Sequence, residues 1–182
     1  MRILLICLAL LGNLSGSSQT GVRQVNACSI LKKPLNADLI KHNAKAIIKG
    51  KDACVLSLID SVSHYILKRK DFAFIECLDS LYSVSDGYVS EYFLEIGTKL
   101  FYKKFGLIIK YAYKEKYNPQ GSIEKLVIES LSSELSDTDN KNIYKKKLDD
   151  FMKKEFVKNN FTLDEIKYAN KLESKINSSK FD

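Results

Sequence analysis

Proline and glycine are scarce in this chain of 182 residues, which has two prolines, eight glycines and no tryptophan. A sheet protein needs turn residues between many short strands. It also needs stretches in which apolar and polar residues alternate, and none is visible here. The scarcity of both features argues against a sheet and predicts an all-α fold.

Long hydrophobic runs are missing as well, since a helix needs about 20 apolar residues to cross a bilayer. One short apolar run, 3–11, follows Arg2 and precedes small polar residues. This pattern is typical of a secretory signal peptide, which we expect at 1–18. We therefore expect a secreted or periplasmic protein with no transmembrane segment in the mature chain.

Cysteine is also rare: there are four, and Cys7 would leave with the signal peptide. Cys54 and Cys77 would be offset by about 14 Å along neighbouring helices, whereas a disulfide allows a Cα separation of only about 4.4–6.8 Å. Cys28 is therefore the expected partner of either one, with Cys28–Cys54 taken as the pair. Two alternatives stay open. The three thiols remain unbridged, or Cys28 carries a lipid anchor, because 25–28 loosely resembles a lipobox.

The length predicts one domain, with an N-terminal arm at 19–33, an α-helical domain at 34–178 and a tail at 179–182. Its centre is the stretch 71–105, which contains two amphipathic helices joined at Ser85, Asp86 and Gly87. We expect Asp86 to cap the second helix, Gly87 to take a positive φ and Tyr88 to begin the buried stripe.

Apolar periodicity predicts about eight short amphipathic helices in antiparallel hairpins. Besides the central pair, they are expected at 34–49, 52–69, up to 117 after a kink or break at Gly106, 123–135, 143–158 and 163–176. Thr162 and Glu165 form a capping box for the last one. Two architectures fit, a layered HEAT-like array and an irregular helical bundle. The spacing of helix pairs, about forty residues, favours the layered array.

Motifs of the common catalytic sites are missing from the sequence: there is no nucleophile elbow, phosphate-binding glycine loop, HExxH or paired CxxC. We therefore expect no cofactor and no metal. Two carboxylate–histidine pairs, Asp38 with His42 and Asp60 with His64, stand four residues apart. The helical periodicity directs the second pair to solvent, so we interpret both as exposed surface pairs.

The excess of positive charge, +7 overall, is the remaining functional lead. A basic and aromatic surface is formed in the sequence by Lys103, Lys104, Lys110, Tyr113 and Lys114. Such a surface binds polyanions, although the same pattern also occurs where tyrosines edge a core and lysines cover its solvated face. Because a secreted protein meets little nucleic acid, we do not expect nucleic acid as the partner.

These observations together predict a secreted, non-catalytic α-helical module whose partner is another macromolecule, most plausibly a protein. One alternative is an enzyme with a dispersed site of carboxylates and tyrosines, represented at the hairpin tip by Asp86, Tyr88 and Glu91. Another is a module that binds an anionic polymer or a membrane surface through the basic and aromatic residues.

Overall fold

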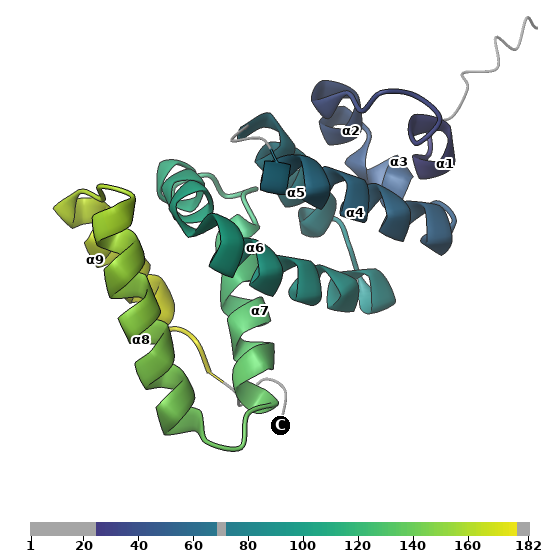
Figure 1. The fold of residues 1–182 in the computed structure, drawn as a ribbon. Helices are drawn as coiled ribbons and strands as arrows, with labels where there is room; N and C mark the ends of the chain where they lie inside the picture. Colours follow the sequence, from purple (N-terminus) through teal and green to yellow (C-terminus); the bar gives the residue numbers. More distant parts are fainter. Residues whose placement is uncertain (1–24, 69–71, 178–182) are drawn as a thin grey trace, which may run out of the picture.

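The fold is all-α in a computed structural model that describes residues 25–68 and 72–177 (Figure 1). The expected signal peptide, the first part of the arm and the tail at 179–182 lie outside these residues. Within them there are nine helices and no strand: α1 (Ala27–Ile30), α2 (Ala37–His42), α3 (Ala44–Ile48), α4 (Asp52–Lys68), α5 (Phe72–Ser83), α6 (Gly87–Lys114), α7 (Ile123–Ser136), α8 (Lys141–Lys158) and α9 (Leu163–Glu173).

Helix α6 lies at the centre and contacts α4, α5, α7, α8 and α9. The short helices α1 to α3 cover α4 and α5 at one end of the molecule, whereas α8 and α9 form the other end (Figure 1). Of the two architectures expected from the sequence, this is the packed bundle.

The core follows the buried side of α6, where Phe93, Phe101 and Phe105 are fully buried. The Phe105 ring packs against Phe151 and Phe161, with centroids 5.6 and 5.5 Å away. Fully burying a side chain of this size contributes roughly 1.5–3 kcal/mol. These contacts fix α6 against α8 and the α8–α9 turn.

The central hairpin is confirmed at its turn, where Gly87 has a φ of +48°. The neighbouring details differ from expectation. Asp86 occupies the N-cap position of α6, but its side chain makes no capping hydrogen bond. Tyr88 is 62% exposed, and Val89 begins the buried stripe instead. Stepping from Phe93 by one helical turn towards the N-terminus reaches Val89, which leaves Tyr88 outside the apolar face.

The single helix expected at 34–49 is wrong, because the chain forms α2 and α3 with a break at Asn43. Asn43 has a φ of −114° and a ψ of 14°, and its side-chain amide donates to the carbonyl of Leu39 at 2.8 Å. An asparagine side chain competes with the helical backbone for hydrogen bonds in this way.

The kink expected at Gly106 is also misplaced, since the non-helical residue inside α6 is Lys104, with a φ of −135°. Gly106 is buried beneath the α8–α9 turn. A Cβ atom at Gly106 would lie 2.3 Å from Oδ1 of Asn159. The glycine therefore permits a close approach of this turn rather than a bend of the helix.

A disulfide connects the described part of the arm to the bundle. Cys28 on α1 is bonded to Cys54 on α4, with a Cα separation of 5.1 Å, and Cys77 is a free, buried thiol. Residues 27–30, expected in a polar arm, form a helix that buries Ala27 and Ile30. The side chain of Asn26 accepts from the Ser29 amide at 3.0 Å and starts this helix.

Candidate functional site: an acidic groove between α6 and α7

The hairpin-tip residues Asp86, Tyr88 and Glu91 are all exposed at the start of α6. Glu91 lines a groove between α6 and α7, whereas Asp86 and Tyr88 are not part of its lining. The structure therefore connects one of the three residues to a surface depression.

The basic and aromatic residues lie on the later part of α6, and several are used inside the fold. Lys110 donates to the Asn159 carbonyl at 2.9 Å and lies over the Phe161 ring. The Tyr113 ring packs edge-on against another tyrosine ring of α9, at 5.6 Å between centroids. Lys114 forms an ion pair with Glu115 at 3.5 Å. Lys103 is exposed, and Lys104 is the residue at which α6 kinks. Part of this set thus holds α8 and α9 against α6.

The two carboxylate–histidine pairs are exposed, as the periodicity predicted. His42 contacts the backbone carbonyl of Asp38 at 2.7 Å through Nδ1. The Asp60 carboxylate accepts the hydroxyl of Tyr92 at 2.7 Å. Across residues 25–68 and 72–177, no group of three or more His, Cys, Asp or Glu residues could hold a metal ion.

Tyrosine hydroxyls donate to carboxylates from other helices throughout the bundle. The pairs are Tyr82–Glu129, Tyr92–Asp60, Tyr102–Glu134, Tyr111–Asp79, Tyr144–Glu134 and Tyr168–Glu124. Desolvation is the largest cause that raises the pKa of Tyr92 to about 12, followed by its bond to Asp60. Burial and contact with a carboxylate favour the neutral hydroxyl, so the tyrosines remain donors at neutral pH.

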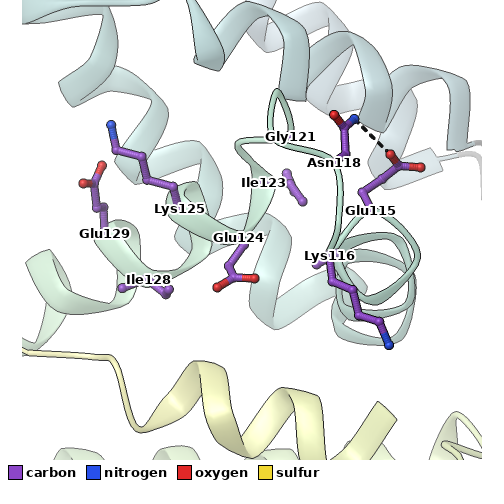
Figure 2. Close-up of a pocket in the computed structure, with 10 residues that line it drawn as sticks. Glu115, Lys116, Asn118, Gly121, Ile123, Glu124, Lys125, Ile128 and Glu129 are labelled. Atoms are coloured by element: carbon purple, nitrogen blue, oxygen red, sulfur yellow. Dashed lines mark hydrogen bonds between the residues drawn. The ribbon is translucent and has the colours of Figure 1, made fainter. Parts of the chain in front are cut away.

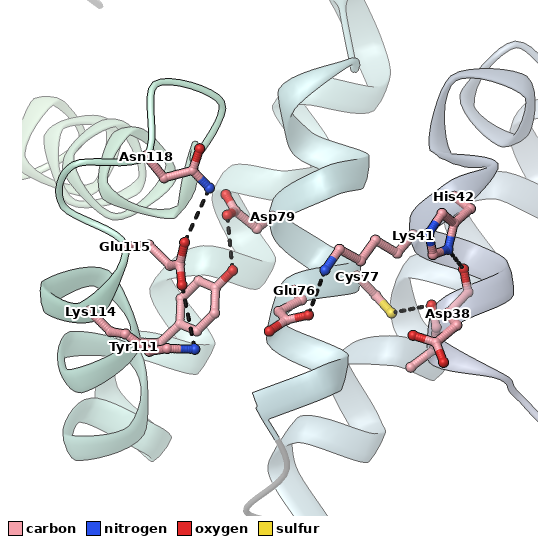
Figure 3. A network of polar contacts seen from close by, with 11 residues as sticks. Asp38, Lys41, His42, Glu76, Cys77, Asp79, Tyr111, Lys114, Glu115 and Asn118 are labelled. Atoms are coloured by element: carbon pink, nitrogen blue, oxygen red, sulfur yellow. Dashed lines mark hydrogen bonds and ion pairs between the residues drawn. The ribbon is translucent and has the colours of Figure 1, made fainter.

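Asp79, which Figure 3 shows beside Tyr111, was not singled out by the sequence. It is the most buried of these carboxylates. It accepts the Tyr111 hydroxyl at 3.1 Å, and the amide and hydroxyl of Ser122 at 2.5 and 2.8 Å. Ser122 precedes α7, so Asp79 supplies negative charge at the positive end of that helix. A carboxylate within the apolar stripe of α5, between Leu78 and Tyr82, is the sequence signal that could have revealed it.

A pocket of about 290 Å³ lies beside the turn that joins α6 to α7 (Figure 2). Its Glu124 carboxylate accepts bonds from Tyr168 and from Lys175, which lie 2.8 and 2.5 Å away. On another side, Glu115 accepts the Asn118 amide at 3.1 Å. These side chains are engaged by the fold, so the pocket offers few polar groups to a ligand.

The groove between α6 and α7 is larger, at about 710 Å³. Its lining comprises Glu91, Leu94, Glu95, Thr98 and Lys99 from α6, Ser130, Ser133 and Glu134 from α7, and Asp137, the C-cap of α7. Four carboxylates and one lysine give this lining a net charge of −3. The chain as a whole carries +7. The groove is therefore a local acidic site in a basic protein.

The carboxylates of the groove have no cationic partner within the described residues. None of Glu91, Glu95 and Asp137 makes an ion pair there, and the carboxylate of Glu134 accepts only the hydroxyls of Tyr102 and Tyr144. Such an arrangement leaves the negative charge of the groove available to a cation from outside.

Ser130 adds a second polar feature to the groove. It is 1% exposed, and its Oγ is the single buried side-chain N or O atom in the described part of the chain without a hydrogen-bond partner. Ser130 lies where α6 and α7 approach closely, because a Cβ at Gly97 would be 2.1 Å from this oxygen. A buried hydroxyl without a partner costs free energy, so its presence calls for an explanation.

Comparisons of this chain with protein-family models, with curated protein sequences and with solved structures find no match, so its function is inferred from its own residues.

Proposed function

We propose that this chain is a non-catalytic helical module that binds a protein partner through the groove between α6 and α7. The observation that carries this proposal is the combination of apolar lining at Leu94 with carboxylates that no cation in the described chain neutralises. Protein interfaces commonly combine an apolar centre with a polar rim in this way.

The distribution of tyrosines and carboxylates supports binding rather than catalysis. The tyrosines that donate to carboxylates join different helices of the bundle, for example Tyr82 on α5 with Glu129 on α7. A catalytic acid or base has to reach substrate, usually in a concave pocket. In this protein the paired groups stabilise the packing instead.

The disulfide supports a location outside the cytoplasm, because such bonds persist mainly in oxidising compartments. No helix among the described residues is long and apolar enough to cross a membrane. We propose that the protein acts in the secreted or periplasmic space and meets its partner there.

Photo-cross-linking from the groove tests this function. A photoreactive amino acid would replace Thr98, which lines the groove, and in a control protein it would replace the exposed Ser57 on α4. We expect a discrete cross-linked protein from position 98 only. Unlabelled wild-type protein should compete for it, and protein with a Leu94→Lys change should not. Identical products from both positions would contradict the proposal.

A further inference from the structure

We infer that the groove between α6 and α7 takes a basic amphipathic helix of the partner, with lysine or arginine at the rims and apolar side chains on the floor. This inference rests on the proposed function and adds the chemistry of the ligand. A helix laid into an apolar groove is a common way of recognising a peptide.

The net charge of the groove determines the sign of the charge that the ligand should carry. The groove lining carries a net −3, from four carboxylates and Lys99. Charges on exposed surfaces are screened beyond about 8–10 Å at physiological salt. A cation inside the groove therefore experiences the nearby carboxylates more strongly than the distant lysines that make the whole chain basic.

The acidic residues occupy positions that the free protein disfavours. Glu91 and Glu95 are one turn apart on α6, where like charges repel. Glu134 lies in the last turn of α7 and Asp137 is its C-cap, at the negative end of the helix, which has no basic residue in its last turn. A bound cationic segment would relieve both kinds of repulsion.

A helix fits the spacing of these groups. Glu91 and Glu95 are about 6 Å apart along their helix axis, which equals the rise between residues i and i+4 of another helix. Leu94 supplies apolar contact between the rims. A bare metal ion is a poorer fit, because the described residues contain no group of three or more ligands that could hold one.

Another copy of this chain is the main competing occupant. Helix α8 is itself basic, with Lys145, Lys146 and Lys147 exposed, and Ile143 is 51% exposed. Most exposed side chains of α8 are lysines, and its exposed apolar side chains, Ile143 and Val157, lie near opposite ends of the helix, whereas the groove requires an apolar face to cover Leu94. We therefore commit to a helix of a different protein and treat self-association as an outcome of the test.

The test measures the binding of two labelled helical peptides to the full-length, disulfide-bonded protein by fluorescence anisotropy. Both peptides have the same leucine face; one carries lysine and the other glutamate at the remaining positions. We expect the lysine peptide to bind at least tenfold more tightly. Changing Glu91→Gln, Glu95→Gln and Asp137→Asn together should weaken it about tenfold, since rim charge pairs are individually weak and three are removed.

A matched control removes three exposed carboxylates elsewhere, with Asp38→Asn, Asp52→Asn and Asp164→Asn. It changes the net charge equally, so peptide affinity should stay within about twofold if the groove is the site. Equal loss in both triple variants would show non-specific attraction and would overturn the inference. Equal binding of the two peptides by the wild type would overturn it as well.

Two further outcomes separate this inference from the proposed function. In the first, the groove triple variant still forms the cross-link from position 98, whereas Leu94→Lys abolishes it. The groove then binds a protein without using its charge, and only this inference fails. If sedimentation shows a dimer that the groove triple variant loses, the occupant is a second copy, which also overturns it. If no cross-link specific to position 98 forms, the proposed function itself is contradicted.

Discussion

Carboxylates lie at both ends of α7, Asp79 of α5 at one and Glu134 and Asp137 at the other, and they differ in how they are satisfied. At the N-terminal end, Asp79 is buried, accepts three hydrogen bonds and complements the helix dipole; Figure 3 shows the bond from Tyr111. At the C-terminal end, Glu134 and Asp137 oppose the dipole and face a groove. The first arrangement stabilises the fold. The second adds local repulsion that a ligand can relieve, so the difference separates structural from functional charge.

Removing Asp79 should produce the largest effect on stability. Asp79→Ala leaves the hydroxyl of Tyr111 and the amide of Ser122 without their acceptor in a buried place, whereas the Ser122 hydroxyl keeps the backbone carbonyl of residue 79 at 2.7 Å. Each buried donor without a partner costs about 1–3 kcal/mol, so we expect a loss of about 3–5 kcal/mol in the free energy of unfolding. Urea denaturation followed by circular dichroism measures it.

A carboxylate of the groove is the proper control for Asp79. Glu95→Gln removes a charge that has no cationic partner among the described residues and lies one turn from Glu91. Its effect on the free energy of unfolding should stay within about 0.5 kcal/mol, as for most surface changes. If Asp79→Ala and Glu95→Gln lose the same free energy of unfolding, the carboxylates at the two ends of α7 do not differ in this way.

Breaking the disulfide should give the next largest loss. The Cys28–Cys54 bond closes a loop with a sequence separation of 26. Restricting the unfolded chain over such a loop contributes about 3–4 kcal/mol. Replacing both cysteines by serine should lower the midpoint of urea denaturation, and reductant should then have no further effect. Cys77→Ser is unsuitable as a control, because that thiol is buried.

The local features of the fold could be predicted from the sequence, whereas the pairs of residues far apart in the chain could not. The capping box of Thr162 and Glu165 and the turn at Gly87 depend on neighbouring residues, and both are present. The contact between Asp79 and Ser122 joins residues 43 apart in the chain. Periodicity shows which side of a helix faces inward, but it does not show which other helix lies there.

The groove could be predicted only in part for the same reason. Glu91 was a candidate on α6, but its relation to Glu134 and Asp137 requires the packing of α6 against α7. That packing depends on the close approach at Gly97, whose Cβ would clash with Ser130. A glycine on the buried side of a helix is the one local sign of such an approach.

Changing Gly87 should have an intermediate effect, because this residue sets the direction of α6 and hence the position of the groove relative to α5. Its φ of +48° is unfavourable for a β-branched residue, although no atom from elsewhere in the fold lies within 4 Å of a Cβ at this position. Gly87→Val should therefore cost about 1–2 kcal/mol through backbone strain alone. Thermal unfolding measures this loss.

Asparagine is the matched control at position 87, since it tolerates the left-handed conformation better than valine does. Gly87→Asn should retain most of the stability that Gly87→Val loses. If the two variants melt at the same temperature, strain at this φ is not what the glycine relieves.

The smallest expected effect is a gain, not a loss, in the free energy of unfolding. It comes from a comparison of two serines of α7 with the same burial. Ser130 and Ser132 are each 1% exposed. The Ser132 hydroxyl accepts the Asn177 amide at 3.1 Å, whereas the Ser130 hydroxyl has no partner within the described residues. Ser132→Ala should lose about 1 kcal/mol of unfolding free energy, and Ser130→Ala should gain about 0.5–1 kcal/mol. Equal destabilisation by both changes in urea denaturation would show that the Ser130 hydroxyl is already satisfied in the free protein.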